Sequence, residues 1–427
     1  MYSRFLTFSH LLVILGGLFA FSDGVWSNAV HGFFYKLLDD GFMLLQEQTL
    51  LLFGSTMMLI LLGIRARPEF LVICFLSVSV GVYEYIVSIF FDTAYYGFWS
   101  LINGFLFPAI WMLFLLRTKN QKLYFQSYYI GAIIFMVAAL VVLFFFDVNA
   151  GFLKQDAAGS AITGLKGQYE GSWFFLIVGN VNKQSNYLLM SMLLGPMLLE
   201  LEEPDRLYSV YVVLATVLLI LLCSRATLML LPIVLFLNKR YFLPLSMKTR
   251  VLAWLLLVIL LAMTFDHLLT IFKFVFLNIR REGQVVDIMG TMNNRLSQWG
   301  ALSEIIEDPS VLIHGIGIAN YGLMLGGGPG TGTHNLFLDH LVASGLYGVI
   351  VLGFIVVYGL IKALFISDKR VLMGYIFFLA LAFREYTFAY AFVTSMGGLI
   401  FIFLLYVTFN YPKKNECVAN LALQADA

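Results

Sequence analysis

Charged residues are scarce in this sequence. Asp, Glu, Lys and Arg make up 12% of the 427 residues, whereas 61% of the residues are hydrophobic and 16% are aromatic. A soluble domain has about 25% charged residues, and here no long polar stretch separates the apolar runs, so soluble cytosolic enzymes are excluded. The 26 basic and 25 acidic residues nearly cancel, which gives no support for a nucleic-acid partner. The composition therefore predicts one integral membrane domain.

Cysteine is rarer still. The three cysteines are Cys74 and Cys223, which lie in apolar runs, and Cys417, which lies near the C-terminus. Their wide spacing fits neither a disulfide framework nor a set of zinc ligands. We therefore predict that the chain binds no metal and uses no cofactor.

Long apolar runs are abundant. A helix needs about 20 residues to cross ~30 Å of hydrocarbon, so the sequence predicts an all-α, polytopic membrane protein with about twelve transmembrane helices. We expect a single transmembrane helical domain at 1–410 and a cytoplasmic tail at 411–427. The runs that meet or nearly meet the required length are 5–22, 42–64, 69–91, 98–116, 124–146, 175–199, 207–223, 225–237, 248–265, 335–361, 371–384 and 386–409.

The positions of Lys and Arg predict the orientation of these spans. Cytoplasmic loops carry the excess of basic residues, which here predicts that both termini are cytoplasmic. Residues 267–334, between spans nine and ten, then form a large external loop with short helices. Residues 207–237 are short for two full crossings, since ~30 helical residues rise only ~45 Å. We predict two short helices that meet at Ser224-Arg225, because a single span would place Lys239 and Arg240 outside.

One histidine lies where water-borne and lipid-borne groups could meet. His334 joins a glycine-rich external segment, 326–332, to the tenth span. A neutral imidazole is well suited to removing a proton from a hydroxyl at neutral pH. An interfacial histidine that caps the tenth helix is the alternative interpretation. The glycine-rich segment lacks the ending of a phosphate-binding P-loop, which favours a flexible lid or entry loop.

Arg295 lies in the apolar stripe of a predicted helix at 292–307. On that helix it shares a face with Trp299, Leu302 and Ile306. If the stripe packs on the membrane bundle, the guanidinium is directed inward and needs an anion, because an unpaired buried charge is costly. A cation–π contact with Trp299 is the alternative.

Arg225 and Arg384 both interrupt stretches that are too short for two full spans, so we expect their charges below the outer membrane surface. An ionisable residue at that depth is by default a candidate functional residue. Snorkelling of Arg225 and a salt bridge between Arg384 and its neighbour Glu385 are the structural alternatives.

Other basic and polar residues occur at the predicted outer surface. Lys183 and Asn186 belong to a polar cluster where span six begins, which a solvated helix start would explain equally well. Arg280 and Arg281 end an aromatic, apolar run, and a lipid headgroup contact is the default interpretation for them. Together the residues predict an external-facing site in the outer leaflet that binds a lipid-linked phosphate or diphosphate.

The segment that begins at His334 resembles the pattern HNxxLxxLxxxGLxG of the O-antigen ligase and polymerase superfamily, the bacterial Wzy and WaaL proteins. The matching positions are His334-Asn335, Leu338, Leu341, Gly345-Leu346 and Gly348. Further elements similar to that family are 182–186, Ser224-Arg225, Arg295, Trp299, Ala301, Asp308-Pro309 and Gly315-Ile316-Gly317. The N-terminal third matches the family only in hydropathy.

The resemblance implies a metal-independent, inverting glycosyltransferase that faces the periplasm from the bacterial inner membrane. It implies a donor glycan on undecaprenyl diphosphate, a sugar hydroxyl as acceptor, and His334 as the base. It also implies that Arg295 and Arg225 hold the diphosphate and stabilise the leaving charge. The further diphosphate or glycan contacts that it suggests are Lys183, Asn186, Arg280, Arg281 and Arg384.

Three functions remain open. A polymerase would add the growing chain to a lipid-linked repeat unit, with membrane lipids and a chain-length regulator as further candidate partners. A ligase would add the finished chain to lipid A core. The modest size of the loop at 267–334 favours the polymerase, since a ligase must grip a large core. A lipid-linked oligosaccharide flippase or transporter is the alternative of another class, but it usually shows paired repeats that this chain lacks.

Overall fold

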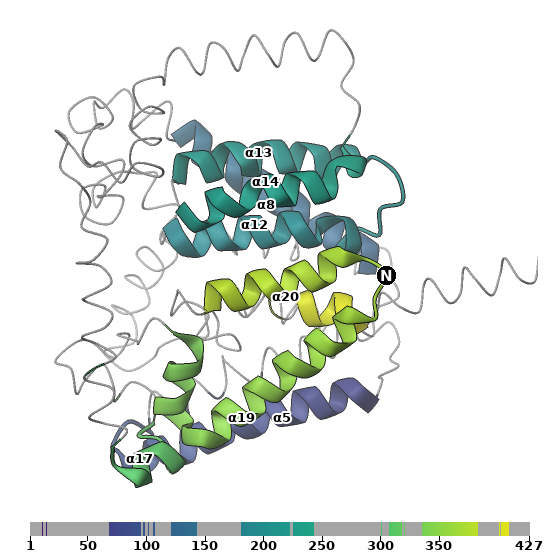
Figure 1. Cartoon of the computed structure of the whole chain (residues 1–427). Coiled ribbons are helices and arrows are strands. Elements are labelled where there is room, and N and C mark those ends of the chain that lie inside the picture. Colours follow the sequence, from purple (N-terminus) through teal and green to yellow (C-terminus); the bar gives the residue numbers. More distant parts are fainter. Residues whose placement is uncertain are drawn as a thin grey trace, which may run out of the picture.

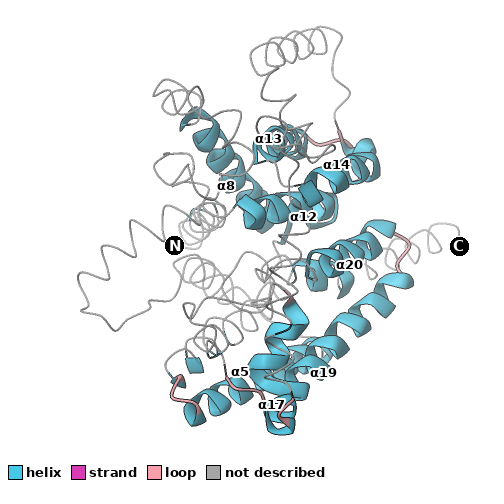
Figure 2. Cartoon of the chain, turned by 60° about the vertical axis from the view of Figure 1, so that its left-hand side comes forward, coloured by secondary structure: helices cyan, strands magenta, loops and turns pink. Residues whose placement is uncertain are grey.

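The computed structural model describes the chain in five main stretches, at 68–94, 121–142, 181–242 without 223–224, 307–317 and 335–382 (Figure 1). Residues 403–409 and the positions 11, 14, 97, 98, 101, 106, 300, 320 and 401 are also described. All regular structure in these residues is helical, as Figure 2 shows, which confirms the all-α prediction for the described part.

Apart from η4 and α17, the helices overlap predicted apolar runs. Their bounds are α5 Pro68–Phe90, α8 Gln121–Val142, α12 Val181–Leu198, α13 Arg206–Leu222, α14 Arg225–Asn238, the 3-10 helix η4 Lys239–Tyr241, α17 Pro309–His314, α19 Leu336–Leu364 and α20 Lys369–Ala382. Within the described residues, α8 and α19 are long and apolar enough to cross a membrane. The spans at 5–22, 42–64, 98–116 and 248–265 fall largely or wholly outside the described residues.

Residues 206–238 form two helices, as predicted, and not one. The helix α13 has 17 residues and α14 has 14, with Cys223 and Ser224 between them. At 1.5 Å per residue they are roughly 26 and 21 Å long, so each is shorter than a full hydrocarbon crossing.

Helix α19 exposes large apolar side chains on the half that follows residue 345. Ile350, Phe354, Val357 and Ile361 are 48 to 65% exposed, and their spacing places them on one face of the helix. A stripe of this kind would be unfavourable in water, but it is typical of a helix face in contact with lipid.

The largest core is rich in tyrosine and contains a proline whose effect the neighbouring helices compensate. Pro196 lies inside α12 and has no N–H, so the carbonyl of Met192 lacks its helical donor. The hydroxyl of Tyr208 (2.7 Å) and the side-chain amide of Asn238 (2.8 Å) donate to that carbonyl instead. These bonds tie α12 to α13 and α14. Gly195 permits the approach, since a Cβ there would lie 2.4 Å from the Tyr208 ring.

Hydrogen bonds between helix ends establish how the helices run. The backbone N–H of Asp205, just before α13, donates to the carbonyl of Tyr241 after α14 (3.2 Å). Arg370, at the start of α20, donates to the hydroxyl of Tyr241 (2.9 Å). The start of α13, the end of α14 and the start of α20 therefore meet, and we call this the basic end. Its basic residues are Arg206, Lys239, Arg240, Lys362, Lys369 and Arg370.

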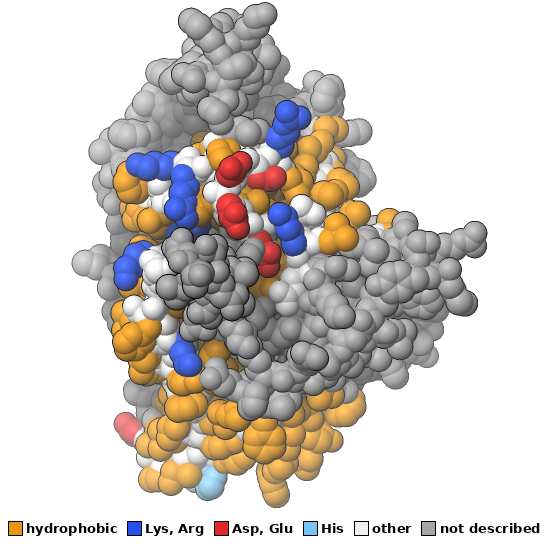
Figure 3. Space-filling model, turned by 90° about the vertical axis from the view of Figure 1, so that its right-hand side faces the viewer, with side chains coloured by type: hydrophobic (Ala, Val, Ile, Leu, Met, Phe, Trp, Pro, Cys, Tyr) orange, Lys and Arg blue, Asp and Glu red, His pale blue; other side chains and the backbone are white. Residues whose placement is uncertain are grey.

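Figure 3 views the molecule from the side of the basic end, and Lys and Arg side chains gather there with a few acidic ones. The other ends of these helices lie away from it, on the left in Figure 1. We call that region the opposite end; it holds the starts of α12, α14 and α19 and the end of α20.

Candidate functional site

Helix α19 begins at Asn335, the second residue of the His334-Asn335 motif. The Asn335 side-chain oxygen accepts hydrogen bonds from the backbone N–H groups of Phe337 (3.0 Å) and Leu338 (3.2 Å), which is an N-cap. The predicted junction between loop and helix is therefore confirmed to within a residue. His334 itself lies outside the described residues.

Nine residues into α19, the helix breaks at Gly345. This residue has φ 62° and ψ −157°, a conformation that favours glycine. The break deprives the carbonyls of Val342 and Ala343 of helical donors, and both accept from another segment. The N–H of Ile316 donates to Val342 (2.7 Å), and that of Gly317 donates to Ala343 (3.2 Å). Residues 315–317 thus dock into the broken helix.

Glycines make this backbone contact close. A Cβ on Gly345 would lie 2.2 Å from the carbonyl oxygen of Ile313, and one on Gly315 would lie 2.7 Å from the nitrogen of Gly345. Gly348 is needed for a different reason, because its Cβ would lie 1.8 Å from the hydroxyl of Ser344. Two motifs that the resemblance placed far apart in sequence are therefore one structural unit.

The short helix α17 leads into the docking segment. The carboxylate of Asp308 caps it by accepting from the backbone N–H (2.8 Å) and hydroxyl (2.7 Å) of Ser310, and Pro309 occupies the first turn. These hydrogen bonds hold the pKa of Asp308 below its ordinary value. The Asp-Pro motif is thus a helix start, and a small core of Val311, Ile316, Leu338 and Val342 joins α17 to α19.

Helix α5 supports the same unit through polar contacts. The hydroxyl of Tyr83 lies 3.0 Å from Nδ1 of His314 in α17, and that of Ser79 lies 2.6 Å from the hydroxyl of Tyr347 in α19. The helices α5, α17 and α19 form the lowest layer in Figure 1. We name this three-helix arrangement the kinked unit.

A buried ionisable pair lies at the centre of the kinked unit. Nδ1 of His340 is 3.1 Å from Oε1 of Glu84, and the hydroxyl of Ser344 lies 3.2 Å from the same oxygen. The three residues are 4%, 1% and 0% exposed, respectively. Sequence reasoning missed them, although Glu84 is an acidic residue inside a long apolar run, which is the signal that drew attention to Arg225.

The structure describes only part of the predicted site. Lys183 and Arg225 belong to the first turns of α12 and α14, at the opposite end, but the description does not extend to their side chains. Asn186 is 3% exposed, so a solvated helix start does not describe it, and its Nδ2 has no hydrogen-bond partner among the described residues. Residues that lie outside the described part are Arg280, Arg281, Arg295, His334 and Arg384.

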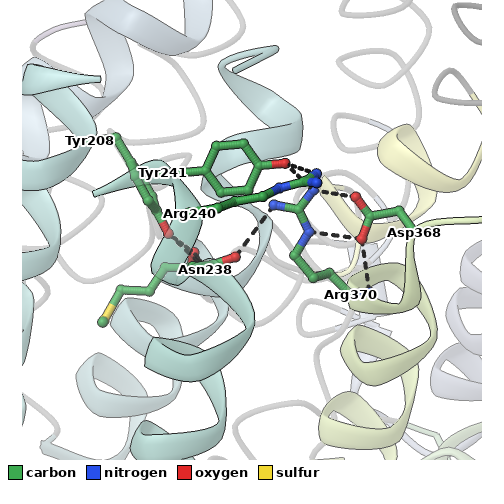
Figure 4. A network of polar contacts seen from close by, with 7 residues as sticks. Tyr208, Asn238, Arg240, Tyr241, Asp368 and Arg370 are labelled. Atoms are coloured by element: carbon green, nitrogen blue, oxygen red, sulfur yellow. Dashed lines mark hydrogen bonds and ion pairs between the residues drawn. The ribbon is translucent and has the colours of Figure 1, made fainter. Parts of the chain in front are cut away.

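The basic end contains a second polar cluster, around Arg370 (Figure 4). The guanidinium, 4% exposed, donates to Asp368 (2.8 Å) and Tyr241 (2.9 Å) and is 3.4 Å from the side-chain oxygen of Asn238. It also lies 4.6 Å from the centre of the Tyr241 ring, and Arg240 makes a second contact with that ring at the same distance. Protein groups therefore satisfy Arg370, which links α14 to α20.

No cluster of three or more His, Cys, Asp or Glu side chains in the described residues could hold a metal ion. Comparison with protein-family models, curated proteins and solved structures finds no match to this chain. The argument about function therefore depends on the motifs and on the geometry of the kinked unit.

Proposed function

We propose that this chain is a membrane glycosyltransferase that transfers a glycan from undecaprenyl diphosphate to a sugar hydroxyl on the periplasmic side of a bacterial inner membrane. The observation that carries the proposal is the docking of residues 315–317 into the break of α19 at Gly345. The docking joins two glycine motifs of the resemblance in one unit, close in sequence to His334.

The arrangement of the helix ends supports a site at the opposite end. The helix starts that carry Lys183 and Arg225 lie at that end, as does the start of α19 directly after His334. Under the positive-inside rule the basic end is cytoplasmic, so the opposite end faces the periplasm. About twelve spans, with both termini in the cytoplasm, remain part of this proposal.

In the proposed reaction, the acceptor hydroxyl attacks the anomeric carbon of the donor glycan. The new C–O bond forms as the bond to the diphosphate breaks, and the configuration inverts. His334 takes the hydroxyl proton, and undecaprenyl diphosphate leaves with the bonding electrons. Arg295 and Arg225 stabilise the charge that develops on the leaving group.

The preferred acceptor is a lipid-linked repeat unit, which makes the chain a surface-polysaccharide polymerase. The test is the gel banding of surface polysaccharide in a deletion strain complemented with the wild type, His334→Ala or Arg295→Ala. Loss of the long ladder, with one repeat still on lipid A core, is expected for both variants at normal protein levels. Loss of all capping, with long chains on undecaprenyl diphosphate, would instead identify a ligase, and normal ladders in both variants would contradict the proposed site.

A flippase or transporter is the second candidate, and the buried pair of Glu84 and His340 favours it, because such pairs occur in proton-coupled carriers. Liposomes containing the purified chain separate the two. With labelled lipid-linked donor and acceptor, a transferase gives longer glycans, whereas a flippase changes only the leaflet that holds the label.

A further inference from the structure

A cavity of about 340 Å³ opens at the basic end, between the end of α14 and the start of α20. That volume lies within the range of about 300 to 1,000 Å³ that is typical of small-molecule sites. Three of the lining side chains are cations and one is an acid, so the lining has a net positive charge. The lining residues are Leu237, Arg240, Ser367, Asp368, Lys369 and Arg370.

The acid in the lining neutralises one of the three cations. Arg370 is buried and paired with Asp368, as Figure 4 shows. Lys369 is exposed, and its ammonium group has no hydrogen-bond or ion-pair partner among the described residues. Arg240 is also exposed, and its contacts with the hydroxyl and ring of Tyr241 occupy only part of a guanidinium with five N–H donors. The acids of the loop between α12 and α13 do not line the cavity, so the lining leaves two cations to meet an anion.

The position of the cavity along α19 indicates its depth in a bilayer. Helix α19 is long and apolar enough to cross a membrane, and it ends at Leu364, just before residues 367–370 of the cavity. Phe365, which follows the helix, is 85% exposed, as expected of a side chain in contact with lipid. A helix that crosses the bilayer ends near the lipid headgroups. The cavity therefore lies at headgroup depth when α19 spans the membrane.

Exposed apolar side chains lead to the cavity along both helices that form it. In α14, Ile233 and Phe236 are 40% and 65% exposed, and Arg240 continues their helical spacing. In α20, Lys369 and the exposed Ile376 are separated by two helical turns, so they share a face. Each of the two cations thus lies at the end of an exposed apolar stripe. This arrangement favours a ligand that carries hydrocarbon next to its negative charge, rather than a free anion.

We propose that this cavity binds the phosphate of an anionic phospholipid, with Arg240 and Lys369 as its direct contacts. Both side chains form charge-assisted hydrogen bonds with phosphate oxygens, and basic pockets between membrane helices are typical sites for anionic headgroups. The carboxylate of Asp368 is paired with Arg370, so the lining offers no acid to the amine of a zwitterionic headgroup. The inference goes beyond the proposed function and does not depend on it, because it requires only an anionic bilayer at the basic end.

Two double variants with the same loss of charge test the site. Arg240→Gln with Lys369→Gln removes the two proposed contacts. Arg206→Gln with Lys239→Gln, the matched control, removes two exposed cations of the basic end that do not line the cavity. Native mass spectrometry of the full chain gives the dissociation constant of the first phosphatidylglycerol bound. We expect binding to weaken about 30-fold in the first double variant and about 3-fold or less in the control.

Three outcomes would overturn the inference. Equal weakening in the two double variants would assign the binding to the diffuse positive charge of the surface. Equal affinity of the wild type for phosphatidylcholine and phosphatidylglycerol would show that the site does not select an anionic headgroup. Inorganic phosphate is the probe for a soluble ligand, and we expect it to leave the lipid bound. Displacement of phosphatidylglycerol by inorganic phosphate at the same concentration would identify a soluble anion as the occupant.

A measurement on the wild-type chain covers the case in which the substitutions alter the fold. Phosphatidylglycerol with a photoreactive group on its headgroup is incorporated into nanodiscs that hold the full chain, and the cross-linked peptides are identified by mass spectrometry. We expect labelling within 237–240 and 367–370, the two segments that line the cavity. Labelling confined to other segments of the chain would contradict the proposed site.

Discussion

The basic end and the kinked unit are held by different kinds of contact. At the basic end, charged groups satisfy one another: Arg370 is paired with Asp368 and lies over the ring of Tyr241. In the kinked unit, the backbone N–H groups of Ile316 and Gly317, which follow α17, donate to carbonyls of α19, and Nε2 of His340 has no hydrogen-bond partner among the described residues. The basic end is therefore held by charged side chains, whereas the kinked unit depends on close backbone contacts and encloses a buried ionisable pair.

The largest effect is expected from Gly345→Ala. Its φ of 62° and a Cβ 2.2 Å from the Ile313 carbonyl disfavour any side chain, so we expect a loss of roughly 4 kcal/mol of unfolding free energy and of glycan transfer. The matched control is Gly353→Ala in the same helix, where nothing lies within 4 Å of the new Cβ. For each variant, thermal unfolding measures the stability and the polysaccharide ladder measures glycan transfer. Equal behaviour of the two variants would contradict the backbone docking.

Arg370→Ala tests the basic end, the other region in the comparison. Removal of the buried cation deprives Asp368 of its ion pair, which we expect to cost about 3 kcal/mol of unfolding free energy while leaving transfer intact in the protein that folds. Arg240→Ala, which removes an exposed cation from the same Tyr241 ring, is the control and should cost under about 1 kcal/mol. Loss of transfer per folded molecule in Arg370→Ala would show that the basic end also serves function.

A smaller effect is expected from Tyr208→Phe, which removes one of the two donors to the carbonyl of Met192. We expect a loss of about 1 kcal/mol of unfolding free energy. In a Pro196→Ala background the helix supplies its own donor to that carbonyl, so the same substitution should cost less. A double-mutant cycle measured by denaturant unfolding gives the coupling, and additive losses would rule out compensation for the proline.

The smallest expected effect concerns pH and the cap of α17. Because the folded chain lowers the pKa of Asp308 from 3.8, the stability from this cap is fully present above that value and is lost as the pH falls through the lowered pKa. Hydrogen exchange of the α17 amides should therefore speed up in acid relative to other helices. Asp308→Asn keeps the cap without a titratable group, so it should remove the faster exchange of the α17 amides in acid. An unchanged acid response in Asp308→Asn would show that a group other than Asp308 causes it.

Sequence reasoning predicted the helices well and the site only in part. The pattern at 206–238 predicts two helices because its length and its basic residues constrain the topology, and the structure confirms them. The break at Gly345 was not predicted, because a glycine in an apolar run is compatible with a continuous helix. Glu84 and His340 were missed because they are 256 positions apart, and neither stands in a recognisable motif with the other.

The sequence by itself determined where the described helices other than η4 and α17 lie and which loops are basic. Both properties follow from local causes: an apolar run must satisfy its own backbone hydrogen bonds in lipid, and Lys and Arg favour one side of the membrane. Only the tertiary structure decided which groups meet, namely 315–317 with the broken α19, Glu84 with His340, and Tyr241 with Arg370. These contacts join residues distant in the chain, and their energy depends on packing geometry, which leaves no periodic signal in the sequence.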